Sequence, residues 1–224
     1  LIYQERSDQN TPISKKEVTR QHLYERYPQW HTDIDTFLHL LSNRHCTTHR
    51  IDILILHFEA WRIARQQAGN SCLITPDPER HCWHIIVMGH DRAGLLAELS
   101  GVLAAWGVII DAAYISSQTN GHILDTFTAR MDLCPILADP YRRSEVQYAL
   151  SAVLQGQPPA YEAKITERIK SAAKLATHLP QHTIQVKYDL DVRSDCTVVD
   201  LYSNDSPALL YRAAKACHQE GASI

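Results

Sequence analysis

The stretch that decides the fold is WHIIVMGHDRAGLLAELSGVLAAWG, residues 83–107. Its first six residues are mostly apolar and predict a strand, which the polar turn 89–94 follows. Apolar side chains then recur at positions 95/96, 99, 102/103 and 106, a spacing that predicts a helix with one buried face. Gly107 stands where a left-handed residue would end this helix. The stretch therefore predicts a strand, a sharp turn and a helix in direct succession.

A hairpin and a second helix are expected after this helix. Residues 108–117 are rich in Val, Ile and Tyr, and Asn120-Gly121 favours a type I′ turn. Residues 122–131 then predict the partner strand. A helix over 142–154 would bury one stripe of Val and Leu side chains and end at Gly156. The sequence thus predicts an α+β fold with an antiparallel sheet.

A helical lead-in is expected ahead of the first strand. Ser14 and Glu17 have the spacing of a capping box and predict a helix up to about Arg26. A second helix is expected from about Thr32 to Leu41, with Asn43 as its stop. Residues 51–68 fit helical spacing, although their first third is also compatible with a strand.

Composition excludes several classes of function. The formal net charge is −3 and the basic residues form no stripe, so a nucleic-acid partner is not expected. No apolar run is long enough for a membrane span, and residues 1–13 have no signal-peptide pattern. The six cysteines include no Cys-x-x-Cys pair, which is typical of a reduced, cytoplasmic protein. A start at Leu1 without Met suggests a trimmed chain or a fragment.

The order strand, helix, strand, strand resembles an ACT domain, a ferredoxin-like βαββαβ module that binds amino acids. The residues that carry the resemblance are the turn Asp91–Leu96, the stop at Gly107 and Asp125-Thr126-Phe127 on the third strand. Within this group, the chain resembles the C-terminal regulatory end of PII uridylyltransferase/uridylyl-removing enzymes. The resemblance implies helices on one face of an antiparallel sheet, and a second ACT unit after a linker.

A weak internal repeat agrees with that second unit. DSPALL at 205–210 matches DRAGLL at 91–96 in spacing, a strand at 197–202 precedes it, and a helix to Gln219 follows it. A strand at 184–190 either completes the first sheet or starts the second. The expected domains are a helical lead-in, a first ACT domain, a helical linker and an incomplete second ACT domain, at 1–75, 76–157, 158–183 and 184–224.

The turn at 91–95 offers the chemistry that an amino-acid zwitterion needs. Free amide groups at a helix N-terminus attract a carboxylate. Asp91 is able to receive an α-ammonium group, and Gly94 lets a ligand approach closely. The alternative is that Asp91 only caps the helix.

The resemblance implies further ligand-binding residues, because ACT ligands lie between two units, against this turn and the start of the second strand. The expected ligand-binding residues are Asp91, Arg92, Ala93, Gly94, Leu95, Ile110, Asp111, Asp205, Ser206 and Leu209. Two positions depart from the family pattern, since Ala93 replaces a usual Pro and Ala208 replaces Gly. The second change leaves open whether the second turn binds a ligand or only packs.

Metal and catalytic motifs are not expected. His90-Asp91 is also the dipeptide of metal-dependent phosphohydrolases, but it follows a strand, and that chemistry uses helical ligands. The groups His45/Cys46/His49 and His81/Cys82/His84 contain zinc-ligand residue types without a full structural-site pattern, so packing histidines are expected. No nucleotidyltransferase, Walker or hydrolase-elbow motif occurs. We therefore expect no metal, cofactor or catalytic residue in this segment.

The resemblance implies a regulatory segment that senses an amino acid, glutamine in the named family, and controls nitrogen signalling. The PII protein would be a partner through the parent enzyme, and pairing of ACT units would allow a homodimer. Two alternatives stay open. One is a free-standing ACT regulator that binds an amino acid and a partner protein, and the other is a phosphohydrolase that uses His90-Asp91.

Overall fold

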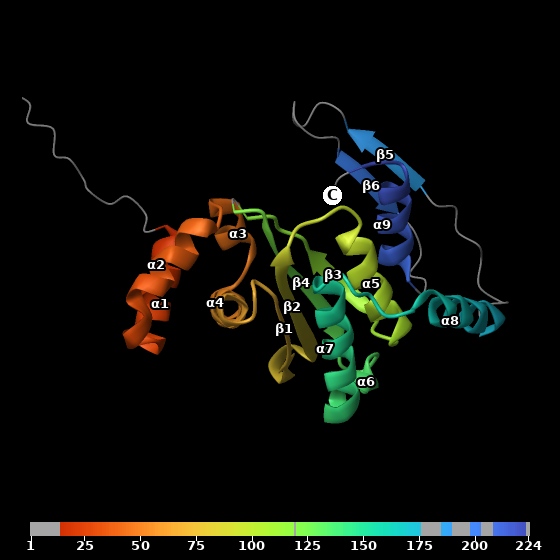
Figure 1. Cartoon of the computed structure of the whole chain (residues 1–224), viewed down its shortest axis with the longest axis horizontal. Coiled ribbons are helices and arrows are strands. Elements are labelled where there is room, and N and C mark those ends of the chain that lie inside the picture. Colours follow the sequence, from red (N-terminus) through yellow and green to blue (C-terminus); the bar gives the residue numbers. More distant parts are fainter. Residues whose placement is uncertain (1–13, 119, 176–184, 190–197, 203–207, 223–224) are drawn as a thin grey trace, which may run out of the picture. The chain divides into compact units, whose positions relative to one another are not determined.

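The structure is a computed structural model that describes residues 14–118, 120–175, 185–189, 198–202 and 208–222. Its elements, in chain order, are α1 (Lys15–Arg26), η1 (Pro28–Trp30), α2 (His31–Leu40), α3 (Asn43–Thr48), α4 (Ile51–Gln66), β1 (Ser71–Asp77), η2 (Pro78–Arg80), β2 (Cys82–His90), α5 (Leu95–Ala105), β3 (Ile110–Tyr114), β4 (His122–Arg130), α6 (Pro135–Ala138), α7 (Pro140–Leu154), α8 (Glu162–Leu175), β5 (Gln185–Asp189), β6 (Val198–Tyr202) and α9 (Leu209–Gln219) (Figure 1). The chain thus combines helices and strands, as expected of an α+β fold.

The main sheet has four strands in the order β1-β2-β4-β3. The strand β2 therefore pairs with β4, the strand that follows the hairpin, as in a ferredoxin-like sheet. Residues 82–89 of β2 are all buried, and because successive side chains point to opposite faces, both faces of this strand are covered. The α+β, ferredoxin-like fold class with an antiparallel sheet is confirmed.

The edge position beside β2 is occupied by β1, which the sequence analysis did not predict. The strand expected at 184–190 appears as β5 and pairs instead with β6, antiparallel, from Gln185 opposite Tyr202 to Asp189 opposite Val198. Of the two alternatives for this strand, the structure thus supports the start of a second sheet.

The chain divides into two compact parts. The first part contains the described residues of 1–73, with 86–91 and 114–126, and the second contains 74–85, 92–113 and the described residues from 127 onward. In the first part, the core side chains come from the lead-in helices and the included pieces of β2 and β4. They include Leu23, Ile34, Phe37, Leu54, Phe58, Trp61, Ile86, Met88 and Leu124.

Serine hydroxyl groups cap two of the lead-in helices, α1 and α3, and the second of these was not predicted. Ser14 caps α1 by accepting a hydrogen bond from the Glu17 amide, as predicted. Asn43 was expected to end the second helix, but α2 ends at Leu40 and Asn43 begins the short helix α3. The physical reason is Ser42, whose hydroxyl accepts from the His45 amide at 3.0 Å and so opens a new helix.

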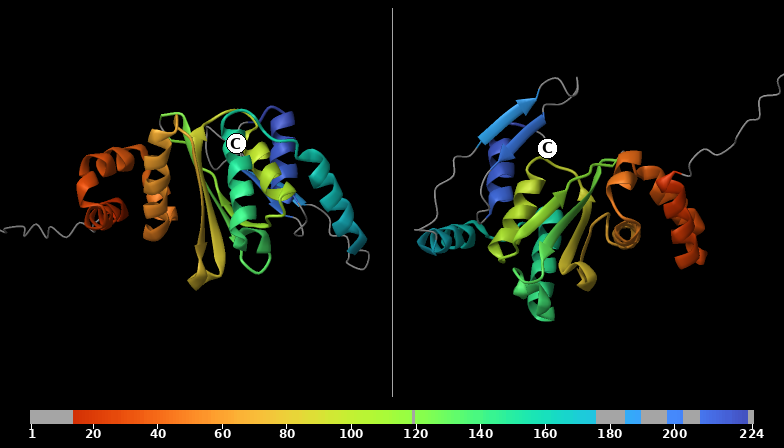
Figure 2. Two further views of the ribbon diagram at one scale, coloured as in Figure 1. Left: turned by 60° about the horizontal axis from the view of Figure 1, so that its bottom comes forward. Right: turned by 180° about the vertical axis from the view of Figure 1, so that it is seen from behind.

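In the second part, α5 lies between α7 and α9, as Figures 1 and 2 show. The side chains of Leu99, Val102 and Leu103 on α5 are fully buried. At its C-terminal end, Ala105 packs in one cluster with Ile165 of α8 and Tyr211 of α9. The helix α5 therefore joins the βαββ segment to the elements that follow the linker.

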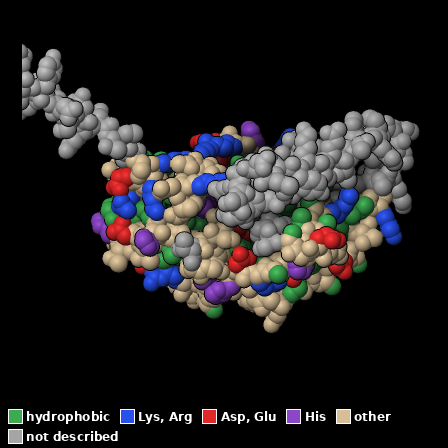
Figure 3. All heavy atoms as spheres, turned by 90° about the horizontal axis from the view of Figure 1, so that it is seen from above, with side chains coloured by type: hydrophobic (Ala, Val, Ile, Leu, Met, Phe, Trp, Pro, Cys, Tyr) green, Lys and Arg blue, Asp and Glu red, His purple; other side chains and the backbone are tan. Residues whose placement is uncertain are grey.

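The surface carries both signs of charge. On the face shown in Figure 3, Lys and Arg side chains alternate with Asp and Glu over the described residues. Within the described residues, the helices are all too short or too polar to cross a membrane.

Candidate functional site

The turn between β2 and α5 is sharp, as the sequence predicts, and Asp91 does not cap the helix. Gly94 is the N-cap residue of α5 and has a left-handed conformation, with φ +79°. It makes no side-chain cap, and the Asp91 carboxylate instead accepts a hydrogen bond of 3.2 Å from the Ser117 hydroxyl. The alternative in which Asp91 caps this helix is therefore wrong.

Other residues of the turn are engaged by the protein itself. The Arg92 guanidinium forms an ion pair with Glu98 and donates a bond of 3.0 Å to the Val153 carbonyl oxygen. The hydrogen bonds to Glu98 raise the pKa of Arg92 above its usual value.

A Cβ placed on Gly94 would lie 3.0 Å from the His218 ring, so that ring covers the glycine. Ala93 is exposed and Leu95 is buried in the core.

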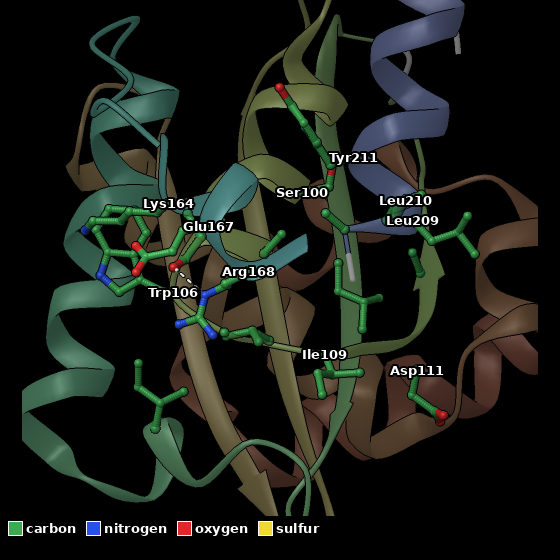
Figure 4. A pocket seen from close by; sticks show the side chains of 18 of the residues that line it. Ser100, Trp106, Ile109, Asp111, Lys164, Glu167, Arg168, Leu209, Leu210 and Tyr211 are labelled. Carbon is green, nitrogen blue, oxygen red and sulfur yellow. Dashed lines mark hydrogen bonds between the residues drawn. The ribbon is translucent and has the colours of Figure 1, made fainter. Parts of the chain in front are cut away.

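A cavity of about 1070 Å³ lies at the opposite end of α5, within the second part of the chain. It is lined by the end of α5, the residues that lead into β3 and most of β3, residues of α6 and α7, one side of α8 and the start of α9. Figure 4 shows the labelled lining residues from α5, α8 and α9 and from the start of β3. Three of the predicted ligand-binding residues, Ile110, Asp111 and Leu209, line this cavity, while residues 91–95 do not.

One wall of the cavity depends on Gly107. Arg168 of α8 donates from Nε to the Ala105 carbonyl oxygen at 3.0 Å, and its guanidinium lies next to Gly107. A Cβ at Gly107 would stand only 2.7 Å from the Arg168 Nη2 atom. Beside it, the Lys164 ammonium lies 4.0 Å from the centre of the Trp106 ring. Glycine is therefore favoured here by its left-handed φ of +82°, and the absence of a Cβ leaves room for the Arg168 guanidinium.

The cavity presents charges of both signs. Its cationic residues are Arg142, Lys164 and Arg168, and its acidic residues are Asp111, Glu145 and Glu167. The first amide groups of α9, which begins at Leu209, have no partner within the helix and favour a negative group. Such a lining offers positive groups for the carboxylate of a small zwitterion and negative groups for its ammonium group.

The start of α9 repeats the turn before α5. Ala208 is the N-cap residue of α9 and is left-handed, with φ +60°, where Gly94 has +79°. Leu-Leu follows in both cases. The two other predicted residues of this turn, Asp205 and Ser206, lie outside the described residues.

Sequence analysis missed the α8 residues of the cavity. Lys164, Glu167 and Arg168 were treated as part of a linker helix. Their spacing puts them on one helix side, next to the apolar positions Ile165 and Ile169. That spacing was the available signal, but it does not reveal which surface the helix meets.

The phosphohydrolase alternative gains no support from the geometry. The His90 ring lies against the His122 ring, tilted by 39° with centroids 4.1 Å apart, and burial lowers the pKa of His122. Among the described residues, the groups of three or more potential metal ligands include neither His90 nor Asp91.

Comparison with known proteins points to one kind of enzyme. The chain is similar to the bifunctional uridylyltransferase/uridylyl-removing enzyme of Rhodospirillum rubrum, with 27% identity over 145 residues, or 64% of this chain. It is similar to the same enzyme of Caulobacter vibrioides, with 27% identity over 186 residues, or 82% of this chain. The corresponding enzyme of Azospirillum brasilense is 27% identical over 143 residues.

These matches cover only a small part of each relative. The chain spans 15% of the Rhodospirillum rubrum enzyme and 19% of the Caulobacter vibrioides enzyme. No protein-family model matches the chain, and no solved structure matches it. The chain is thus similar to a region of bifunctional uridylyltransferase/uridylyl-removing enzymes.

Proposed function

We propose that this chain is a regulatory, amino-acid-sensing segment of a bifunctional PII uridylyltransferase/uridylyl-removing enzyme, built from ACT units, with glutamine as its ligand. The observation that carries the proposal is the cavity in which the start of β3 meets the start of α9. Similarity to a region of such enzymes supports the parent protein.

The repeated turn supports the pairing of two ACT units. Each turn places a left-handed residue, Gly94 or Ala208, directly before Leu-Leu and a helix. In the ACT resemblance, the ligand lies between two units, against the turn and the start of the second strand. The cavity combines the second strand of the first unit, at Ile110 and Asp111, with the turn of the second unit, at Ala208 and Leu209.

The charges suggest how a zwitterion would be oriented. The α-carboxylate would face Arg168 and the first amides of α9, because both are electropositive. The α-ammonium group would face Asp111, the acidic residue on β3. Asp91, which was also predicted to bind the ligand, lies in the turn before α5 and not in this cavity. We keep that turn as a competing position for the ligand.

Regulation would follow if the ligand binds one arrangement of the two ACT units more tightly than another. The contact between α5 and α9 is suited to this role because it joins the two repeats, through Ala105 and Tyr211 among others. In the parent enzyme, glutamine would thereby shift activity on the PII protein from uridylylation toward removal of the uridylyl group.

The test is calorimetric titration of the chain with glutamine, with glutamate and alanine as comparison ligands. Two matched variants, Asp111→Asn and Asp91→Asn, each remove one charge at nearly constant volume. We expect glutamine to bind the wild type, and Asp111→Asn to raise the Kd at least tenfold, because a charged hydrogen bond is worth about 1.5–3 kcal/mol. Loss of binding only in Asp91→Asn would instead place the ligand at the first turn. An absence of heat with all three amino acids would contradict the proposed function.

A further inference from the structure

Three histidine rings meet in the first compact part of the chain. His45 lies in α3, His49 follows at the C-terminal end of that helix, and His57 lies in α4. One ring nitrogen from each lies within 4.8 Å of the other two, and His45 Nε2 is 3.0 Å from His57 Nδ1. The spacing of four residues between His45 and His49 is one that zinc sites use on helices.

The outer nitrogens of two rings are held by hydroxyl groups. His45 Nδ1 is 3.0 Å from the Ser116 hydroxyl, and His57 Nε2 is 2.7 Å from the Thr126 hydroxyl. Ser116 is itself fixed, because its amide donates to the Asp125 carboxylate at 3.1 Å. Metal-binding histidines have this arrangement, in which a partner on one ring nitrogen orients the other nitrogen toward the ion.

The rings are buried, with exposed fractions of 5% for His45, 6% for His49 and 0% for His57. Burying polar rings is costly unless their nitrogens have partners. A bound metal ion would supply such a partner to the inner ring nitrogens.

We propose that His45, His49 and His57 form a binding site for a divalent transition-metal ion, best matched by Zn²⁺. Zinc–nitrogen bonds of about 2.0–2.1 Å in a tetrahedral site separate the ligand nitrogens by roughly 3.3–3.4 Å. Small ring movements bring the three nitrogens from their present separations to that value. Three protein ligands leave the fourth position for water. Ser116 and Thr126 are positioning residues for this site, which is independent of the proposed amino-acid site.

A second group of potential ligands, Asp77, Cys82 and His84, lies in the other compact part. The Asp77 carboxylate is already engaged there, since it accepts from the Arg80 amide and from Arg80 Nη1. A change of His84 therefore tests whether the metal ion binds at this second group instead of at the three histidines.

The experiment titrates the whole chain, without a histidine tag and after treatment with a chelator, with Co²⁺ followed by its visible absorption. Zn²⁺ is then added in competition. The variants are His45→Gln, His49→Gln and Ser116→Ala, and the controls are His84→Gln and His39→Gln, a change of an exposed histidine on α2. We expect one ion per wild-type or control chain, a Kd raised at least tenfold in the two ligand variants, and a Kd raised about tenfold in Ser116→Ala.

Thermal unfolding guards against variants that simply fail to fold. Zn²⁺ is expected to raise the Tm of the wild type and of His39→Gln, and to leave the Tm of a folded His49→Gln unchanged. Three results would overturn the proposal. They are no binding at about 100 μM ion, binding lost in His84→Gln, and an unchanged Kd in both His45→Gln and His49→Gln.

Discussion

At the residue scale, the same backbone conformation is occupied by glycine in one turn and by alanine in the other. Gly94 has φ +79° and Ala208 has φ +60°. Glycine adopts this region at no steric cost, whereas a residue with a Cβ loses about 1–2 kcal/mol there. The second turn therefore carries strain that the first one avoids.

Exchanging these residues should have opposite effects on stability. Ala208→Gly should raise the free energy of unfolding by up to about 1 kcal/mol, because it relieves that strain. Gly94→Ala should lower it by more than 1 kcal/mol, since the new Cβ also meets the His218 ring. Urea unfolding measures both.

Gly156→Ala is the matched control for Gly94→Ala. Its φ of +73° brings the same strain, but among the described residues only the glycine and its chain neighbours come within 4 Å of the new Cβ. A Gly94→Ala loss no larger than the Gly156→Ala loss would contradict the covering role of His218.

The Asp125 carboxyl group is the most perturbed acid among the described residues. Only 2% of the residue is exposed, and burial raises its pKa from 3.8 to about 7. The sequence marked Asp125 as part of a family-like triplet, but periodicity alone did not reveal that this acid would be buried.

This shift predicts a specific dependence of stability on pH. The unfolded chain releases the Asp125 proton near pH 4, whereas the folded chain keeps it to about pH 7. The contribution of Asp125 to stability is therefore lost as the pH rises from 4 to 7, by at most about 4 kcal/mol for some three pKa units. Asp125→Asn does not titrate, so its stability relative to wild type should increase over this range, as measured by urea unfolding at each pH.

Asp132→Asn is the control for the pH series. Asp132 is exposed and its pKa is lowered by hydrogen bonds from Arg130, so it stays ionised between pH 5 and 7. Its curve should run parallel to wild type over that interval. A parallel curve for Asp125→Asn as well would show that the buried carboxyl group has an ordinary pKa.

At the element scale, strong periodicity and caps made most of the fold predictable. The helices at 15–26, 51–66 and 95–105 and the strand at 122–130 follow apolar spacing and punctuation by Ser, Gly or Asn. The missed elements lack such signals. The helix α3 has six mostly polar residues, and β1 contains Pro76 and shows no alternation, so only tertiary pairing with β2 makes it a strand.

The candidate cavity was predictable only in part. Ile110 and Asp111 were expected because the ACT resemblance places the start of the strand after Gly107 at the ligand, and Leu209 follows from the repeat. Arg168 and its neighbours on α8 enter through a contact across more than sixty positions of sequence, with the Ala105 carbonyl as acceptor. A single sequence does not encode such a docking in any local pattern.

The packing of α9 on α5 gives an element-scale prediction. Tyr211 is 7% exposed and joins Ala105 and Ile165 in one cluster, whereas Tyr148 on α7 is 79% exposed. Tyr211→Ala should therefore lower the free energy of unfolding by about 2–4 kcal/mol, and Tyr148→Ala by less than about 0.5 kcal/mol. Equal losses in the two variants, measured by urea unfolding, would show that α9 does not pack on α5.

At the scale of the whole molecule, the chain corresponds to 15–19% of the length of the enzymes that it resembles. The proposed regulatory role therefore concerns a region of such enzymes and not their whole length. Three features are consistent with two ACT units in this chain. They are the sequence repeat, the similar starts of α5 and α9, and the cavity at the start of α9.

A parent enzyme with this segment should therefore lose its response to glutamine, and keep its basal activity, when Asp111 is changed to Asn. The reason is that the carboxylate is proposed to bind ligand and not to take part in chemistry. The measurement is uridylylation of PII with and without glutamine. A variant that responds to glutamine like the wild type would argue against regulation through this cavity.

The most direct test of the central claim is the titration of isotopically labelled protein with glutamine, followed by amide NMR shifts. We predict saturable shifts concentrated at Ile110, Asp111, Leu209 and Leu210, together with the Arg168 side chain, and small shifts at Ser117 and Asp91. Saturable shifts confined to residues away from this cavity, or no shifts at millimolar glutamine, would contradict the account.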